Sequence, residues 1–295
     1  MKLRPLPLGL LLATLCLGGE RPFTPADQLR AVQRFSYQLQ NLDVAAAAAS
    51  AADLLVIDPE GDGDRLTAKQ VAALRKRPGG GRRLVLAYLS IGEAEDYRPY
   101  WQAAWKKSPP RWLAGENPDW PGNYKVRYWD AGWQAVILGN AAAPLDRIVA
   151  DGYDGVYLDI VDGYEYWEDR GLADARTRMI TWVSRIAAHA RAARPGFLVV
   201  PQNGAALGAS ADYLKVIDGI GREDLFFDGD TPQPDDALAE AIPELQRFRA
   251  AGKPVFVIEY CRQRANKRIV NVRARQRGFV PLIAPRDLDR LTISP

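Results

Sequence analysis

Eight short apolar segments, each followed by a stretch with helical features, constrain the fold of this chain most strongly. The stretch 177–196 shows the helical pattern, because it places Ile180, Val183 and Ile186 on one face and ends at Gly196. The predicted strands span residues 35–40, 54–60, 83–93, 155–162, 196–204, 217–224, 254–261 and 278–284.

Strands that alternate with helices pair in parallel, because parallel neighbours need a crossover connection. Eight parallel strands close into a barrel whose interior side chains can fill. The alternative, an open doubly wound sheet, usually carries a Gly-rich turn after its first strand, whereas NLDVAAAAAS follows the first strand here. We therefore predict an α/β fold, a (β/α)8 TIM barrel that forms a single domain over residues 20–295.

A long aromatic segment separates the third and fourth predicted strands. Residues 94–150 contain six of the eight tryptophans: Trp101, Trp105, Trp112, Trp120, Trp129 and Trp133. Crossover connections rarely need this length, and long ordered loops often have a function. We predict a Trp-rich insertion that has a function, that forms a packed subdomain or extra cap helices, or that does both.

The first residues have the pattern of a secretory signal peptide. Lys2 and Arg4 precede the apolar run LPLGLLLATLCLGG, which is too short to span a bilayer and ends in small residues. We predict a signal peptide over residues 1–19, with an N-terminal membrane anchor as the alternative. The prediction implies a secreted or periplasmic protein without stable membrane insertion.

Removal of this segment changes the charge and the cysteine content. Loss of Lys2 and Arg4 lowers the formal net charge from +3 to +1, and loss of Cys16 leaves Cys261 as the single cysteine. A nearly neutral chain has no electrostatic reason to bind nucleic acid. We predict a monomer with no nucleic-acid partner and no disulfide within the chain.

Polar residues concentrate at the carboxyl ends of the predicted strands, where parallel barrels collect their chemistry. Most of them are acids, and an acid at a strand end can also cap the following helix. Acids at the ends of many consecutive strands are better explained by a common site, because burying an unpaired carboxylate is costly. The candidates are Asp58, Tyr88, Glu93, Asp159, Asp162, Asn203, Glu223, Glu259 and Tyr260.

The stretch DGVYLDIVDGYEYW shows how one of these acids should point. Residues two apart on a strand share a face, so Asp159 shares a face with Tyr157, while Val156 and Leu158 take the other. We expect Asp159 to point into the mouth of the barrel. By the same alternation, Glu259 shares a face with the valines of its own strand.

The residue types present exclude several kinds of catalysis. The single histidine, His189, lies within a predicted helix, which excludes Ser-His-Asp, Cys-His and His-rich zinc sites. Two carboxyl groups can cleave a glycosidic bond, one as a general acid and the other as a nucleophile or base. A carboxylate site can instead hold Ca²⁺ or Mg²⁺, but the spacing of these acids matches no known loop site. We predict no metal and no cofactor.

Several segments together resemble glycoside hydrolase family 114, the endo-α-1,4-polygalactosaminidase-like proteins. They include LLVIDPEGDG, VLAYLSIGEAEDYRPYW, DGYDGVYLDIVDGYEYW, VVPQNG and GKPVFVIEYC, and the resemblance extends over residues 35–284. It implies a secreted or periplasmic TIM barrel that hydrolyses an amino-sugar polysaccharide related to galactosaminogalactan.

The resemblance also implies the catalytic pair, Asp159 and Glu223. Asp224 lies beside Glu223, and Glu259 on the seventh strand is a rival for its role. The predicted sugar-binding residues are Asp58, Tyr88, Glu93, Asp162, Asn203, Glu259 and Tyr260. Two alternatives stay open: a barrel that binds polysaccharide without cleaving it, and a hydrolase of a different exopolysaccharide.

Overall fold

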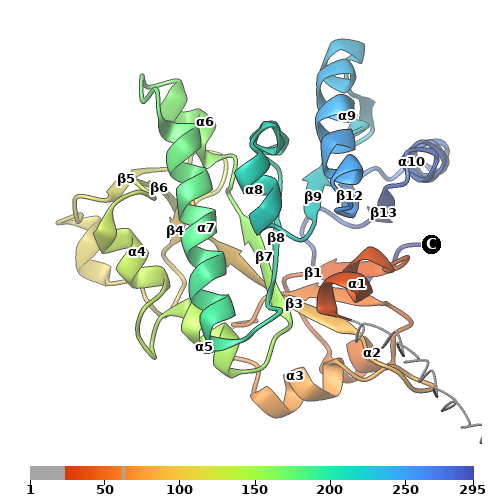
Figure 1. Cartoon of the computed structure of the whole chain (residues 1–295), viewed down its shortest axis with the longest axis horizontal. Helices are drawn as coiled ribbons and strands as arrows, with labels where there is room; N and C mark the ends of the chain where they lie inside the picture. The colour runs from red at the N-terminus through yellow and green to blue at the C-terminus, as the bar shows by residue number, and fades with distance from the viewer. Residues whose placement is uncertain (1–23, 62–63) are drawn as a thin grey trace, which may run out of the picture.

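The computed structural model describes residues 24–61 and 64–295, so the predicted signal peptide lies outside the described residues. Its centre consists of eight strands in two parallel sheets, of five and three strands, which together form a ring. Figure 1 shows them among the helices that surround them. The strands are β1 Phe35–Gln38, β2 Leu54–Ile57, β3 Leu84–Ser90, β7 Gly155–Asp159, β8 Leu198–Pro201, β9 Ile220–Glu223, β12 Val255–Glu259 and β13 Val280–Ile283. Each lies within one of the eight predicted strands, which confirms the predicted (β/α)8 barrel.

The ring consists of two arcs, β1-β2-β3-β7-β8 and β13-β12-β9. A parallel bridge between Gln202 and Gly221 joins β8 to β9. At the other seam, the backbone of the C-terminal segment bonds to β1: Ser294 N–H donates to the Phe35 carbonyl at 2.9 Å, and Leu39 N–H donates to the Leu288 carbonyl at 2.9 Å. The C-terminal segment therefore completes the closure of the barrel.

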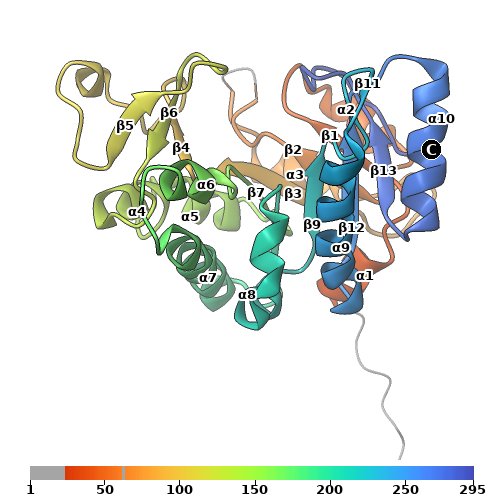
Figure 2. The same ribbon diagram turned by 90° about the horizontal axis from the view of Figure 1, so that it is seen from above.

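Helices surround the ring (Figure 2). They are α1 Pro25–Arg30, α2 Val44–Ala49, α3 Ala68–Leu74, α4 Ala131–Ile137, α5 Pro144–Ala150, α6 Gly163–Glu168, α7 Ala175–Ala193, α8 Ala211–Val216, α9 Asp235–Ala250 and α10 Arg264–Gln276, with short 3-10 helices at Ala103–Lys106 and Ala205–Ala209. Helix α1 precedes the first strand, and its Leu29 is fully buried in the apolar cluster of the barrel interior.

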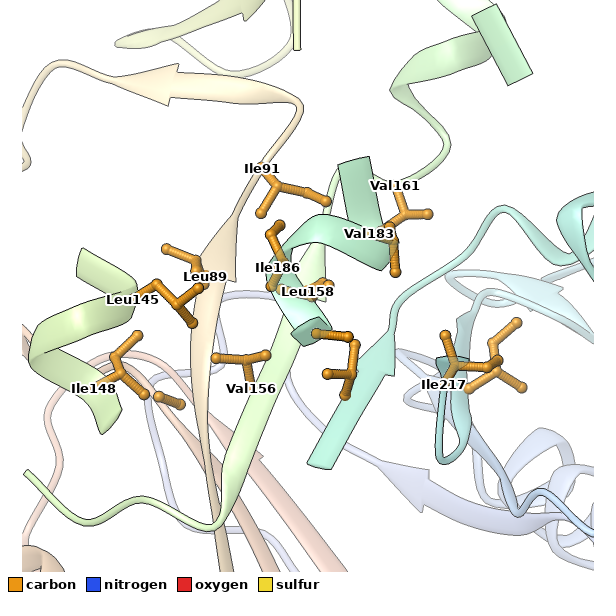
Figure 3. Packing of buried hydrophobic residues seen from close by; sticks show 14 of the residues in the cluster. Leu89, Ile91, Leu145, Ile148, Val156, Leu158, Val161, Val183, Ile186 and Ile217 are labelled. Carbon is orange, nitrogen blue, oxygen red and sulfur yellow. The ribbon is translucent and has the colours of Figure 1, made fainter. Parts of the chain in front are cut away.

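Two apolar clusters pack on the two faces of the ring. The interior cluster includes Tyr37, Tyr157 and Phe256. The outer cluster joins Val156 of β7 to helices α5 and α7 and includes Leu145, Ile148, Val183 and Ile186, as Figure 3 shows. Tyr157 faces inward and Val156 outward, which confirms the predicted orientation of β7.

The Trp-rich insertion between β3 and β7 is a small packed subdomain. It holds an antiparallel sheet of β4 Glu93–Glu95, β6 Asn123–Val126 and β5 Leu113–Glu116. Its tryptophans pack against one another: ring centroids lie 5.0 Å apart for Trp105 and Trp112 and 5.1 Å apart for Trp112 and Trp133. The aromatic side chains of the insertion therefore pack together, and Trp112 and Trp133 belong to the outer cluster of the barrel.

Candidate active site

Asp159 and Glu223 lie together at the carboxyl ends of β7 and β9. The side-chain amide of Gln202, which follows β8 between them, donates to Asp159 Oδ1 at 3.0 Å and to Glu223 Oε2 at 2.7 Å. The two acceptor oxygens are therefore at most the sum of these lengths apart, about 5.7 Å. One amide group thus holds the two carboxylates close enough together to contact the same bound molecule.

The local backbone fixes Asp159. The strand ends there, because Ile160 has a left-handed φ of 54°. Ile160 N–H donates to Asp159 Oδ1 at 2.8 Å, and the Tyr88 hydroxyl donates to Asp159 Oδ2 at 2.6 Å. With Gln202, the carboxylate accepts three hydrogen bonds from groups on three neighbouring strand ends, so its orientation is tightly defined.

Glu223 is held by residues that follow β8 and β12. It accepts hydrogen bonds from the Tyr260 hydroxyl and from the amides of Gln202 and Asn203. Its own N–H donates to Asn203 Oδ1 at 3.2 Å. The strand also needs Gly221, since a Cβ at that position would lie 1.8 Å from the Tyr157 hydroxyl oxygen in the barrel interior.

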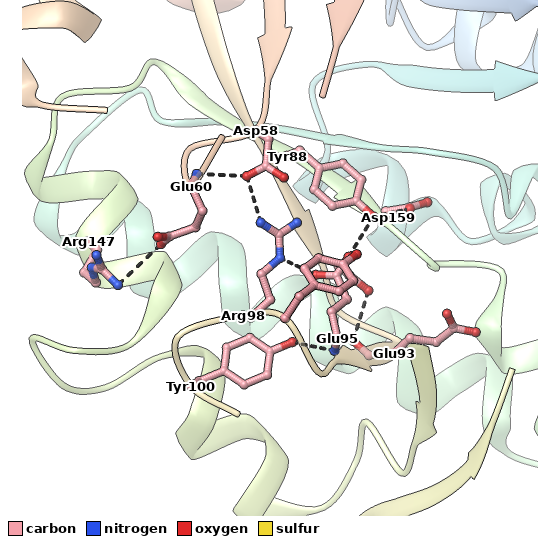
Figure 4. Close-up of polar contacts among 11 residues, drawn as sticks. Asp58, Glu60, Tyr88, Glu93, Glu95, Arg98, Tyr100, Arg147 and Asp159 are labelled. Carbon is pink, nitrogen blue, oxygen red and sulfur yellow. Dashed lines mark hydrogen bonds and ion pairs between the residues drawn. The ribbon is translucent and has the colours of Figure 1, made fainter. Parts of the chain in front are cut away.

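A buried ion-pair network supports Tyr88 (Figure 4). The Arg98 guanidinium donates to Asp58 Oδ1 at 2.8 Å and to Glu95 Oε2 at 2.7 Å. The second oxygen of Glu95 lies 3.5 Å from the Tyr88 hydroxyl and accepts from the Tyr97 hydroxyl at 2.7 Å. Arg98 balances the negative charges of Asp58 and Glu95. The Tyr88 hydroxyl therefore donates its hydrogen bond to Asp159, which is the closer acceptor.

Burial raises the pKa values of Asp159, Glu223 and Asp162, and neighbouring negative charges add to the effect. Burial, followed by the charge of Glu223, raises the pKa of Asp159 to about 8. Burial also raises the pKa of Glu223, although the Tyr260 hydrogen bond opposes this. The pKa of Asp162 rises to about 6 through burial and the nearby charges of Glu165 and Glu223. Two close carboxyls with raised pKa values favour a state in which they share one proton.

Some predicted site residues are near the pair and others are not. The pair is contacted directly by Tyr88, Asn203 and Tyr260. Asp58 is linked to it only indirectly, through its ion pair with Arg98. Glu93 is fully buried and binds Lys125 and Asn117 within the insertion.

The structure corrects the prediction that Glu259 binds sugar or takes the role of Glu223. The valines with which it shares a face pack in the outer cluster, so its side chain points out of the ring and away from the mouth. It is fully buried and accepts from the backbone N–H groups of Phe226 and Phe227 at 2.7 and 3.2 Å. Glu259 fixes the loop after β9, and the structure does not bring it to the pair formed by Asp159 and Glu223.

Three residues that the sequence did not mark as site residues complete the arrangement: Gln202, Glu95 and Arg98. Gln202 stands at a strand end in the same way as the acids do, so its position gave a signal. Arg98 pairs with Asp58 across forty positions of the chain, a contact that no local pattern reports.

A pocket adjoins this ion-pair network and is lined by Pro59, Tyr88, Arg98, Tyr100, Pro144 and Arg147. Neither Asp159 nor Glu223 is among the residues that line it. Among residues 24–61 and 64–295, no three His, Cys, Asp or Glu side chains are grouped to hold a metal ion. Within the same ranges, no helix has both the length and the apolar character needed to cross a membrane.

A closed ring of eight strands with paired carboxyls at its carboxyl end is the architecture of the (β/α)8-barrel glycoside hydrolases. The chain belongs to glycoside hydrolase family GH114, whose family model matches residues 18–295. It is 38% identical to an uncharacterised protein of Deinococcus radiodurans, with 99% of both chains covered. It is 36% identical to an uncharacterised protein of Methanocaldococcus jannaschii, with 87% of this chain and 77% of the relative covered.

Two solved structures share the fold. The crystal structure of Aspergillus fumigatus Ega3 in complex with galactosamine superposes with a TM-score of 0.65 and 22% identity, covering 86% of this chain and 92% of Ega3. The glycoside hydrolase domain of PelA from Pseudomonas aeruginosa superposes with a TM-score of 0.69 and 19% identity, covering 89% of this chain and 98% of that domain.

Proposed function

We propose that this protein is an endo-acting hydrolase of a galactosamine-containing polysaccharide, with Asp159 and Glu223 as its catalytic pair. The observation that carries the proposal is the Gln202 amide, which donates to both carboxylates and so holds them on either side of one site. Membership of family GH114 supports cleavage of a glycosidic bond, and the galactosamine complex of Ega3 supports an amino sugar. We further propose a secreted or periplasmic monomer with one domain over residues 20–295.

The spacing of the pair favours a retaining mechanism. Retaining glycosidases hold their carboxyls about 5–5.5 Å apart, and inverting enzymes about 6.5–9.5 Å apart to admit a water molecule. A nearest separation of at most about 5.7 Å fits the retaining geometry. The protonated carboxyl donates to the leaving glycosidic oxygen while the ionised one attacks the anomeric carbon. Water then cleaves the glycosyl ester, and the first carboxyl takes up the proton of that water.

The surroundings of the pair suit a cationic sugar. Asp162 lies three residues beyond Asp159, and its pKa of about 6 leaves it mostly ionised at neutral pH. The charge of an ammonium group on the sugar would stabilise the ionised forms of Asp162 and the pair. Tyr88, Asn203 and Tyr260 add polar groups that already contact the pair and can bind sugar hydroxyls.

The test is the release of reducing ends from an α-1,4-linked galactosamine polymer. We expect Asp159→Asn and Glu223→Gln each to lower turnover about 10²–10⁴-fold, because each removes a group that transfers a proton or forms the ester. Asp212→Asn is the matched control. Asp212 is an exposed residue of α8 whose carboxylate pairs with Lys215 at 2.9 Å, so this variant should keep its turnover.

Two results would oppose the proposal in different ways. If both pair variants keep the turnover of the wild type, the catalytic assignment is wrong. If the wild-type protein binds the polymer and releases no reducing ends, the barrel is a polysaccharide-binding protein.

A further inference from the structure

Two large aromatic side chains are exposed on the insertion. Tyr97 is 61% exposed and Trp120 is 56% exposed, while most other large apolar side chains of the described residues are buried. We propose that Tyr97 and Trp120 form an additional subsite, which stacks on galactosamine residues of the polysaccharide beyond the linkage that is cleaved. The inference rests on the proposed function and adds to it a residue-level basis for chain-length preference.

Contacts connect Tyr97 to the catalytic pair. Its hydroxyl lies 2.7 Å from Glu95 Oε1, that oxygen lies 3.5 Å from the Tyr88 hydroxyl, and Tyr88 lies 2.6 Å from Asp159 Oδ2. By the sum of these lengths, the Tyr97 hydroxyl is at most about 9 Å from the carboxylate of Asp159. A polysaccharide bound at the pair therefore has Tyr97 within reach of its neighbouring sugars.

Tyr97 is held in place before any ligand binds. Its hydroxyl donates to the buried Glu95, and the Arg98 guanidinium carbon lies 5.2 Å from the centroid of its ring. The ring also packs beside Gly122, where a Cβ would lie 3.8 Å from Tyr97 Cδ1. A ring fixed on one side and open on the other loses little conformational entropy on binding, which favours stacking on a sugar face.

The register of the insertion sheet brings Trp120 to the same end of that sheet. Glu95 of β4 pairs with Asn123 of β6 in antiparallel register. The ladder continues one step further, because Asp96 N–H donates to the Gly122 carbonyl at 2.8 Å. Tyr97 follows Asp96, and Trp120 precedes Gly122 by two residues. The two exposed rings therefore stand on adjoining segments.

The charge around these rings suits an amino sugar. Asp119 is exposed beside Trp120, and Glu116 accepts from Gly122 N–H at 2.7 Å. Asp96 precedes Tyr97 and pairs with Lys106. With Glu95 and Arg98, which contact Tyr97, the carboxylates number four and the cations two, so the surface is net negative. An aromatic surface edged with carboxylates binds a sugar through its ring faces and through its ammonium group.

The experiment measures kcat/KM on α-1,4-galactosamine oligosaccharides from two to eight residues and on the polymer. We expect Tyr97→Ala and Trp120→Ala each to lower kcat/KM on the long substrates about five- to tenfold, the loss that one aromatic stacking contact implies. The loss should be much smaller on the shortest substrate that is cleaved. Binding of the polymer to Asp159→Asn, with and without Tyr97→Ala, should show the same loss in affinity.

Two further variants separate stacking from structure. Tyr97→Phe keeps the ring but loses the hydrogen bond to Glu95, so it should retain most of the long-substrate activity. Val272→Ala, at a position of α10 that is 54% exposed, is the control for loss of an exposed apolar side chain and should match the wild type.

Three outcomes overturn the subsite: equal losses on short and long substrates, no loss with either alanine variant, or a change in oligomeric state alone. No cleavage by the wild type would instead refute the proposed function itself.

Discussion

Replacing Gln202 by Met should remove the hydrogen-bond donor that the two proposed catalytic carboxylates share, with little change in side-chain volume. Gln202 is 3% exposed, and its amide nitrogen bonds Asp159 at 3.0 Å and Glu223 at 2.7 Å. Both bonds disappear in Gln202→Met, and no other described amide bridges the pair.

The size of the effect follows from the strength of these bonds. A hydrogen bond to a charged group contributes about 1.5–3 kcal/mol, and each 1.36 kcal/mol corresponds to about tenfold in rate. Loss of both bonds from the transition state would therefore cost about 3–6 kcal/mol. Since water or a shifted side chain recovers part of this, we expect kcat/KM to fall about 10²–10³-fold.

The assay is the initial rate of reducing-end release together with the melting temperature. Gln38→Met is the matched control, since Gln38 is also 3% exposed but donates to the backbone carbonyls of Gln40 and Asn41 at the end of β1. We expect the control to lose stability but less than about threefold in kcat/KM, because its bonds do not reach the carboxylates. A Gln202→Met enzyme within twofold of the wild type would refute the role given to the bridge.

Three other variants test the rest of the site. Arg98→Met leaves two buried carboxylates without a cation and should lower the free energy of unfolding by about 3–5 kcal/mol; a loss below about 1 kcal/mol in chemical denaturation would contradict this. Because the pKa of Asp159 is raised to about 8, the folded state keeps a proton that the unfolded state has released, so stability should fall as the pH rises from about 4 to about 8. Asp159→Asn should flatten that slope in melting temperature against pH and melt higher than the wild type at pH 8, and an unchanged slope would count against the raised pKa. Gly221→Ala should reduce kcat/KM at least tenfold, because the added methyl group would clash with the Tyr157 hydroxyl and displace the strand that carries Glu223. A fully active variant would show that the strand can shift without loss of activity.

The barrel was predictable because its strands are short apolar runs bounded by polar and glycine residues. Parallel strands covered on both faces have this composition, and their alternation with helices permits few topologies. Asp159 was predictable for the same reason, since Tyr157 fixed the inward face of β7.

Glu259 shows where this reasoning fails. In β12 both faces are apolar, with Val255 and Val257 on the outer face and Phe256 and Ile258 on the inner face. Alternation then shows which residues share a face but does not tell which face is the interior. Which face of β12 points inward is decided by its place in the closed ring, between β9 and β13. That place depends on the whole fold and not on the local sequence.

The supporting contacts were beyond a local pattern for a related reason. Arg98 lies in the insertion and binds Asp58, which follows β2, through a contact made only when the insertion folds back over the barrel. The insertion sheet was also not predicted, because its strands are three or four residues long and carry few apolar residues.

The anomeric configuration of the first-formed product tests the central claim most directly, since it depends on how far apart Asp159 and Glu223 lie. Proton NMR of the reducing ends released in the first minutes of hydrolysis reports that configuration before mutarotation. We expect the configuration of the cleaved linkage to be retained, because the Gln202 amide holds the two carboxyls at a separation that fits a retaining mechanism. Release of the opposite anomer would contradict this, because it needs room for a water molecule between carboxyls that the structure holds too close.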